Sequence, residues 1–240
     1  MQRKYPTVVV DNFFTDPNMI RKFALSLPYA QDPNGRWPGE RTPMLHTINE
    51  NIVYSMAKKI LSVYYDMSTQ VFWDSIQMAF HKIKPYSNEK HSSLNDGWVH
   101  VDGSRTLAGV VYLTPNINEN TGTSIYGIKK EHIDYDVSKV QKNKDILYKN
   151  KTCDKQEYEK EYKLLNSKFN KITEVKNIYN RCILYDAHDY HSGSNYYSKD
   201  QDRLSLIFFF TNLNAGISPK ERIMYFDKEL ECDILKVCQK

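Results

Sequence analysis

The segment TLAGVVYL, residues Thr106–Leu113, is a nearly continuous apolar run of strand length, closed by a Thr-Pro-Asn turn. Further along the chain, RCILY at Arg181–Tyr185 and RLSLIFFFT at Arg203–Thr211 have the same character. Upstream, apolar side chains at Ile76, Met78 and Phe80 alternate with their neighbours, as in a half-buried strand. Several short strands joined by loops predict a mainly antiparallel sheet of the jelly-roll type.

Two amphipathic helices are predicted ahead of these strands. Thr15-Asp16-Pro17 is typical of a helix start, and an apolar stripe follows it from Met19 to Leu27. A second helix is expected from about Ile48 to Tyr65, where Thr47 and Glu50 have the spacing of a capping box. A short strand at Thr7–Val10 precedes both helices. We therefore expect an α+β fold: a double-stranded β-helix core (jelly-roll or cupin-like), flanked by N-terminal helices.

A lysine-rich stretch at approximately 129–177 interrupts the strand pattern. Its apolar residues are spaced by four, three, four and three positions, which predicts one amphipathic helix with a solvated, charged outer face. These residues are Tyr158, Tyr162, Leu165, Phe169 and Ile172. We interpret the stretch as a helical insertion between two core strands of a single domain that spans 1–240.

The overall composition excludes several classes of protein. A hydrophobic content of 40% in 240 residues is enough for a packed core, which excludes wholesale disorder. No apolar run approaches the roughly 18 residues that span a bilayer. The net charge of +4 is spread along the chain, so we expect neither a nucleic-acid nor a membrane partner. The four cysteines form no C-x-x-C pair and no secretory signal is evident, so reduced thiols in the cytoplasm are expected.

Two short motifs carry candidate metal ligands. His100 and Asp102 lie two positions apart, so at a strand end both side chains point to the same face. An imidazole and a carboxylate on one face are two of the three ligands of the facial triad that binds iron(II) and leaves other positions open. The segment YDAHDYHSG, which follows the strand at Arg181–Tyr185, offers either His188 or His191 as the third ligand.

An arginine twelve residues after His191 completes the pattern. Strand alternation places Arg203 and Ser205 on one face and Leu204 on the other. A buried guanidinium needs an anionic partner, and its planar fork suits a carboxylate, to which the hydroxyl of Ser205 can add a further bond.

On these motifs the chain resembles the 2-oxoglutarate- and Fe(II)-dependent oxygenases, in particular the prolyl-4-hydroxylase-like branch with its bacterial and phage members. That superfamily has His-x-Asp, a distant His and then Arg-x-Ser, which stand here as His100-Val101-Asp102, His191 and Arg203-Leu204-Ser205. Further matching stretches are VVVDNFFTDPNMIRKFA near the start and RWPGERT around Gly39. The chain departs from the family in carrying Thr121-Gly122-Thr123 where members often have Gly-Gly-Thr.

The resemblance implies the roles of these residues. It implies His100, Asp102 and His191 as ligands of Fe(II), and it favours His191 over His188 because a small residue and a glycine follow His191. It also implies 2-oxoglutarate as cosubstrate, with its far carboxylate on Arg203 and Ser205, and O₂ as oxidant. Tyr112 is a further candidate hydrogen-bond donor to the cosubstrate.

The reaction implied is hydroxylation of a small-molecule or peptidyl substrate, coupled to oxidative decarboxylation of 2-oxoglutarate to succinate and CO₂. Two alternatives remain open. One is a zinc-dependent hydrolase that uses the same ligands; the other is a non-enzymatic jelly-roll binding module with a vestigial metal site. Near the mouth of the site we expect a set of aromatic and basic residues: Trp37, Arg41, Tyr86, Trp98 and Arg105.

Overall fold

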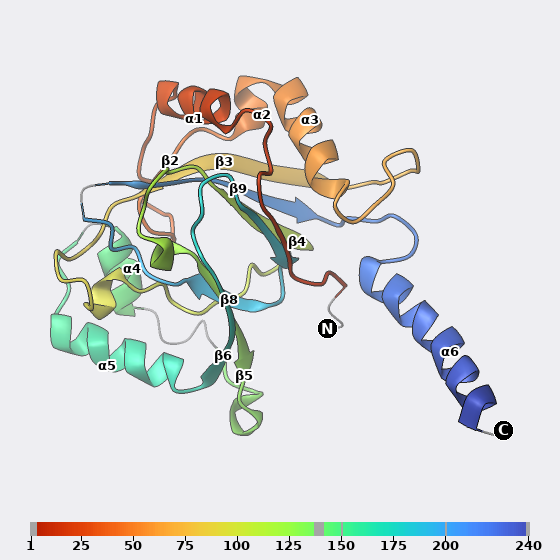
Figure 1. The fold of residues 1–240 in the computed structure, drawn as a ribbon. Coiled ribbons are helices and arrows are strands. Elements are labelled where there is room, and N and C mark those ends of the chain that lie inside the picture. The colour runs from red at the N-terminus through yellow and green to blue at the C-terminus, as the bar shows by residue number, and fades with distance from the viewer. Residues whose placement is uncertain (1–3, 137–141, 150, 200, 239–240) are drawn as a thin grey trace.

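The computed structural model describes residues 4–136, 142–149, 151–199 and 201–238, and two antiparallel sheets organise them (Figure 1). The main sheet has six strands in the order β1 (Val8–Val10), β7 (Cys182–Asp186), β4 (Leu107–Tyr112), β9 (Arg203–Thr211), β3 (Ser75–Ile83) and β2 (Glu40–Arg41). The minor sheet has the order β6 (Phe169–Val175), β5 (Thr123–Ile128) and β8 (Tyr190–Gly193). The mixed helix-and-sheet class with antiparallel sheets is confirmed.

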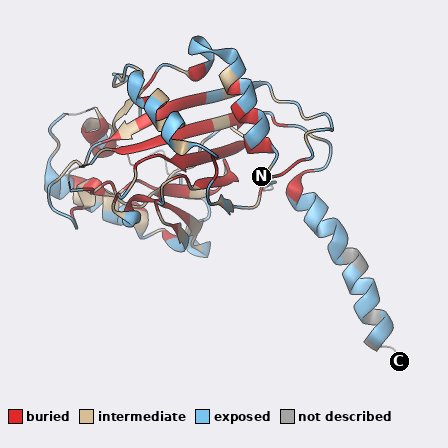
Figure 2. Cartoon of the chain, turned by 45° about the horizontal axis from the view of Figure 1, so that its top comes forward, coloured by how far each residue is buried: buried red, intermediate tan, exposed pale blue. Residues whose placement is uncertain are grey.

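The central strands of the main sheet, β7, β4 and β9, are almost entirely buried (Figure 2). The alternation predicted for β9 is confirmed: Leu204, Leu206 and Phe208 pack in the core beneath the N-terminal helices. Ile207, from the opposite face, belongs to a second core that also contains Ile125 of the minor sheet. The two sheets therefore pack face to face, with apolar side chains between them.

The N-terminal helices begin as their capping residues dictate. Helix α1 (Pro17–Ser26) begins after Asp16, whose carboxylate accepts from the backbone N of Met19, as predicted. Helix α3 (Glu50–Leu61) follows the short α2 (Leu45–Ile48) and is capped by Asn49 rather than by Thr47. The expected capping box is wrong because Thr47 Oγ1 donates to the carbonyl oxygen of Met44 instead.

The lysine-rich stretch contains a 3₁₀ turn η3 (Lys130–His132) and helices α4 (Lys142–Tyr148) and α5 (Lys155–Asn166); its residues 137–141 and 150 lie outside the described residues. Tyr158 and Leu165 of α5 pack on Trp98. The prediction of one helix that continues through Phe169 and Ile172 is wrong, because these residues form β6. That segment pairs with the available edge of β5, and Ile172 stays 65% exposed.

Helix α6 (Pro219–Cys238) extends away from the rest of the chain (Figures 1 and 2). Its first turn is joined to the body by hydrogen bonds from Lys220 N to Lys4 O and from Arg222 Nη2 to Tyr64 O. Beyond that turn it exposes large apolar side chains: Ile223, Met224, Tyr225, Phe226, Leu230, Ile234 and Val237. Within the described residues, no helix has the length and apolarity needed to cross a membrane.

Candidate metal centre

His100 and His191 lie directly opposite each other on two antiparallel segments. The backbone N of each donates to the carbonyl oxygen of the other, at 3.0 and 2.9 Å. Two further backbone hydrogen bonds hold the same segments together on either side of this bridge, from Gly97 N to Gly193 O at 3.0 Å and from Asp102 N to Ala187 O at 2.9 Å. Opposite residues of an antiparallel pair point to the same face, and so do residues two positions apart on one segment. The backbone thus brings three polar side chains together.

The ligand atoms of His100, Asp102 and His191 all lie within 4.8 Å of one another. Asp102 Oδ1 is 3.9 Å from His100 Nε2, and Asp102 Oδ2 is 3.4 Å from His191 Nε2. Each imidazole donates from Nδ1 to the carbonyl oxygen two residues before it, at 2.8 Å in both cases. This bond fixes the tautomer, so the lone pair of each Nε2 is directed toward the cluster.

Three observations fit this cluster to a divalent transition metal. Asp102 Oδ2 is buried and has no hydrogen-bond partner among the described residues, so a cation would satisfy it. Burial, with help from the neighbouring His191, holds the pKa of His100 well below its usual value, which keeps the ring neutral as a ligand must be. Bonds of about 2.1 Å to a common ion place adjacent ligand atoms roughly 3 Å apart, and the 3.4 Å between Asp102 Oδ2 and His191 Nε2 is close to that value.

The cluster lines a cavity of about 120 Å³ between the two sheets. Of the residues expected near the mouth, Trp37, Arg41 and Trp98 line this cavity. Arg105 instead donates from Nη1 to the carbonyl oxygen of Asp102, and Tyr86 Oη accepts from the backbone N of Gly39.

Arg203 lines the same cavity and is 4% exposed. Its Nε donates to Thr121 O at 2.7 Å, and its Nη1 lies 3.4 Å from Ser205 Oγ. The guanidinium carbon lies 5.3 Å from the centroid of the Tyr112 ring. None of these contacts is an anion, so the cavity presents a buried cation whose charge a ligand can balance.

The other two residues predicted to contact the cosubstrate lie beside Arg203. Ser205 is fully buried, and on the neighbouring strands it is opposite His81 and Tyr112. Tyr112 Oη donates to Thr123 Oγ1 at 2.8 Å. The Tyr112 ring thus lies against the guanidinium of Arg203, and its hydroxyl is bound to Thr123.

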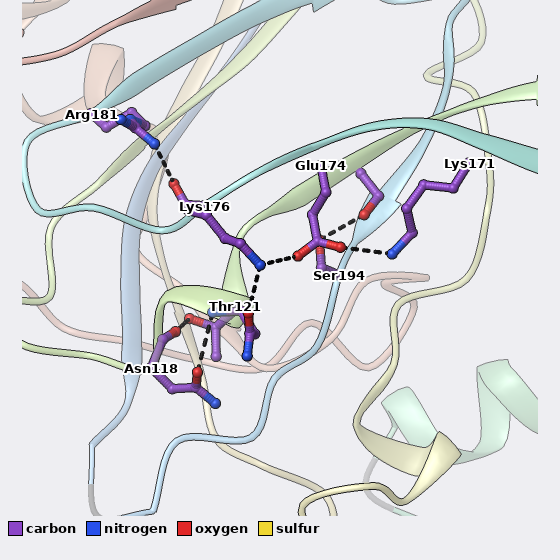
Figure 3. Close-up of polar contacts among 9 residues, drawn as sticks. Asn118, Thr121, Lys171, Glu174, Lys176, Arg181 and Ser194 are labelled. Carbon is purple, nitrogen blue, oxygen red and sulfur yellow. Dashed lines mark hydrogen bonds and ion pairs between the residues drawn. The ribbon is translucent and has the colours of Figure 1, made fainter.

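Thr121 was not among the predicted functional residues, although its backbone carbonyl oxygen accepts from Arg203 Nε. Thr121 ends the 3₁₀ turn η2 (Glu119–Thr121), and its Oγ1 donates to Asn118 O at 2.7 Å (Figure 3). The same hydroxyl accepts from Asn177 Nδ2 at 2.9 Å. Next to it, a Cβ on Gly122 would lie 1.8 Å from Val175 O, so this position requires glycine. The sequence signal for this turn was the departure from the family's Gly-Gly-Thr at Thr121-Gly122-Thr123.

An ion-pair chain on β6 borders this turn. Glu174 lies between Lys171 and Lys176, with carboxylate-to-Nζ distances of 2.8 and 2.7 Å (Figure 3). Lys176 Nζ also donates to Asn120 Oδ1 in η2, at 2.6 Å. The minor sheet is thereby joined to the turn that supplies the carbonyl group for Arg203.

The remaining histidines lie outside the cluster. His188 donates from Nδ1 to Asp186 Oδ1 at 3.0 Å, within the turn between β7 and β8. His81 is buried on β3, and its Nε2 donates to Pro38 O. His46 and His91 are exposed, and His132 is partly exposed.

Comparison with known proteins identifies the family and supports the fold. The chain belongs to a family of unknown function (DUF6445), whose profile matches residues 1–205. No curated protein matches the chain. The structural neighbours include prolyl-4-hydroxylases and other 2-oxoglutarate–Fe(II) oxygenases.

Three solved structures illustrate the similarity. EvdMO1 has a TM-score of 0.50 at 14% identity, over 88% of this chain and 48% of that one, so this chain spans about half its length. HygX from Streptomyces hygroscopicus, with nickel and 2-oxoglutarate bound, has a TM-score of 0.49 at 14% identity, over 87% and 83% of the two chains. A Pseudomonas putida prolyl-4-hydroxylase has a TM-score of 0.43 at 10% identity, over 85% and 91%. At these identities the similarity is one of fold.

Proposed function

We propose that this protein is a 2-oxoglutarate- and Fe(II)-dependent dioxygenase that hydroxylates an organic substrate. In the balanced reaction, the substrate C–H, 2-oxoglutarate and O₂ give the substrate C–OH, succinate and CO₂. One oxygen atom enters the product and the other enters succinate, so no further reductant is needed.

The observation that carries this proposal is the position of Arg203. A guanidinium with no anion among its described contacts lines the same buried cavity as His100, Asp102 and His191. A dicarboxylate that chelates a metal at one end needs a cation of this kind at the other. A hydrolase would use the same ligands but would leave Arg203 without a role.

The protein's own residues would bind and orient the reactants. His100, Asp102 and His191 would hold the metal, which when bound supplies the capacity to activate O₂. The planar fork of Arg203, kept in place by Thr121 O and Ser205 Oγ, would bind the far carboxylate of 2-oxoglutarate. The buried aromatic rings of Trp98 and Tyr185 on the cavity wall would exclude water from the reacting atoms.

We also interpret the two packed sheets as the double-stranded β-helix of these oxygenases, and the stretch that contains α4 and α5 as an insertion into it. This interpretation accounts for why ligands from β8 and from the segment before β4 meet inside the sheets. It also explains why the cosubstrate arginine comes from β9, at the opposite wall of the same cavity.

Conversion of 2-oxoglutarate to succinate tests the proposal. With Fe(II), O₂ and 2-oxoglutarate, the protein should release succinate slowly without a prime substrate, as measured by mass spectrometry. Turnover should stop without O₂ and in Asp102→Ala, and it should persist in His188→Asn, whose imidazole lies outside the cluster. In parallel, Mn²⁺ with 2-oxoglutarate should raise Tm beyond Mn²⁺ alone. A Tm that 2-oxoglutarate does not change would contradict the proposal.

A further inference from the structure

The outer end of the cavity carries a second group of cations, Arg36, Arg41 and Lys144, which we call the cationic rim. The rim comes from the loop before β2, from β2 itself and from α4. Among the described residues that line the cavity, Asp102 is the one carboxylate. An enclosure so rich in positive charge favours anionic ligands.

Arg41 is the central residue of this rim. Its backbone is fixed on both sides, since it exchanges two hydrogen bonds of 3.0 Å with Ala30 and lies opposite His81 on β3. Its guanidinium carbon lies 3.9 Å above the Trp37 ring. Its Nε is buried and has no hydrogen-bond partner in the described part of the chain. Burial lowers the pKa of Arg41 to about 9, because solvent does not stabilise its charge well.

The charges of the inner end do not account for Arg41. There a divalent metal, Asp102, Arg203 and the dianion 2-oxoglutarate would cancel one another. Arg36 has its own partner, with its Nε 3.8 Å from Asp145 Oδ2. Arg41 has no ion pair within 4 Å among the described residues, and the carboxylates of Asp102 and Asp32 act on it only from a greater distance. A counter-charge in direct contact with Arg41 would therefore have to come from a ligand.

We infer that the prime substrate carries an anionic oxygen group, a carboxylate or a phosphate, which binds to Arg41. Lys144, which is 6% exposed and lines the same wall, lies beside that group. With the anion held at the rim, the rest of the substrate extends inward along Trp98 toward Asp102. The inference rests on the proposed function, because it assumes that 2-oxoglutarate occupies the inner end at Arg203.

Small anions provide the test, with the protein loaded with Mn²⁺ and saturating 2-oxoglutarate. Inorganic phosphate and propionate are titrated separately. Propionamide, the uncharged analogue of propionate, is one control, and chloride at equal ionic strength is the other. We expect phosphate or propionate to raise Tm further, and propionamide and chloride to have no such effect. The more effective anion identifies the substrate class as phosphate or carboxylate.

Variants then locate the bound anion. Arg41→Gln should remove at least two thirds of the anion-induced shift and leave the shift caused by 2-oxoglutarate intact. Arg41→Lys should retain part of the shift, since it keeps the charge but loses the fork. Arg21→Gln is the matched control: Arg21 lies on α1, behind the main sheet, where its Nη1 donates to Leu113 O. If Arg41→Gln does not fold, the anion-induced Tm shift of Arg41→Lys is compared with that of the wild type instead, and an equal shift in the two proteins would contradict the inference.

Three outcomes would overturn the inference. These are no anion-induced shift in the wild type, an equal shift in Arg41→Gln, or an anion that merely displaces 2-oxoglutarate from the inner end. If the proposed function is wrong, 2-oxoglutarate itself will not change the Tm of the Mn²⁺-loaded protein. The effect of Arg41→Gln on anion binding can still be measured in that case, with Mn²⁺ alone.

Discussion

The inner end and the outer rim of one cavity are built by different means. At the inner end, His100 and His191 are held by reciprocal backbone hydrogen bonds, and Arg203 is held by a carbonyl group and a hydroxyl group. At the rim, Arg36 comes from a loop, Lys144 comes from a short helix, and Arg41 comes from the two-residue strand β2. Geometry fixed by strands suits a chemistry that tolerates little displacement, whereas loops and short helices can vary with the substrate. The difference assigns chemistry to the inner end and selectivity to the rim.

The largest expected effect is at the inner end. Asp102→Ala should weaken Mn²⁺ binding by about 100-fold or more, because one of three ligands is lost. The same change should leave the stability of the metal-free protein equal or raise it by about 1 kcal/mol, because a buried, unpartnered oxygen is removed. Isothermal titration calorimetry and urea unfolding measure the two quantities.

Trp37→Phe, a change next to the rim residue Arg41, is the counterpart for that comparison. It should leave Mn²⁺ affinity within about twofold, since Trp37 contacts the guanidinium of Arg41 and belongs to no ligand pair. Equal losses of metal affinity in Asp102→Ala and Trp37→Phe would break the distinction between the two ends.

The next effect concerns the two arginines. Arg203→Met should weaken binding of 2-oxoglutarate to the Mn²⁺-loaded protein by roughly 10- to 100-fold, the loss expected for a charge-assisted pair. Arg41→Gln should change that affinity by less than about threefold. Calorimetry with 2-oxoglutarate gives both values, and a larger loss in Arg41→Gln would exchange the roles assigned to the two ends.

A third prediction tests the support behind Arg203. Gly122→Ala should cost about 2 kcal/mol of unfolding free energy and also weaken 2-oxoglutarate binding, because the Cβ would clash with Val175 O and displace the neighbouring Thr121 carbonyl group. Gly127→Ala, on the strand β5 that follows Gly122, is the control. Its Cβ would meet the flexible end of Ile172 at 3.2 Å, so the cost should stay below about 1 kcal/mol. Chemical unfolding with a 2-oxoglutarate titration distinguishes the two variants.

The smallest effect is one of pH. Burial lowers the pKa of both His81 and His100 well below 6.5. As the pH falls, these two imidazoles are therefore protonated in the unfolded chain before they are protonated in the folded chain. Stability should be complete above about pH 7 and fall as the pH drops below about 6.5, by up to about 1.4 kcal/mol per pH unit for each imidazole.

His81 connects the two ends, since it is opposite Ser205 on β9 and donates to Pro38 O in the loop before β2. His81→Gln should therefore reduce the pH slope of the metal-free protein, whereas His91→Gln, at an exposed position, should not. An unchanged slope in His81→Gln would show that the ring is not kept neutral. Urea unfolding between pH 7.5 and pH 5.5 measures the slopes.

How much of the site could be predicted from the sequence depends on whether a feature follows a local side-chain pattern or the pairing of distant segments. The faces of side chains that follow a strand period were predicted correctly. His100 and Asp102 lie on one face of their segment, and Arg203 and Ile207 lie on the face of β9 opposite to Leu204. The bounds of β9 were also predicted as the structure has them. Such patterns are local, so the sequence carries them directly.

Features that depend on distant pairing were not predictable in the same way. The carbonyl group of Thr121 has no side-chain signature, and its role follows from the packing of η2 against β9. Phe169 and Ile172 fit a helical period, yet they lie on β6, which pairs with β5, because an available strand edge outweighs local propensity. Similarly, Arg41 reaches the cavity through the pairing of a two-residue strand, β2, with β3.

The reciprocal bond between His100 and His191 also bears on unfolding. The two residues are 91 positions apart in the chain (191 minus 100). An ion held by both imidazoles would therefore act as a non-covalent cross-link that closes a long loop, the case in which a clip restricts the unfolded chain most. Their two amide hydrogens would report on that cross-link, because any opening that lets them exchange with deuterium must also separate the ligands.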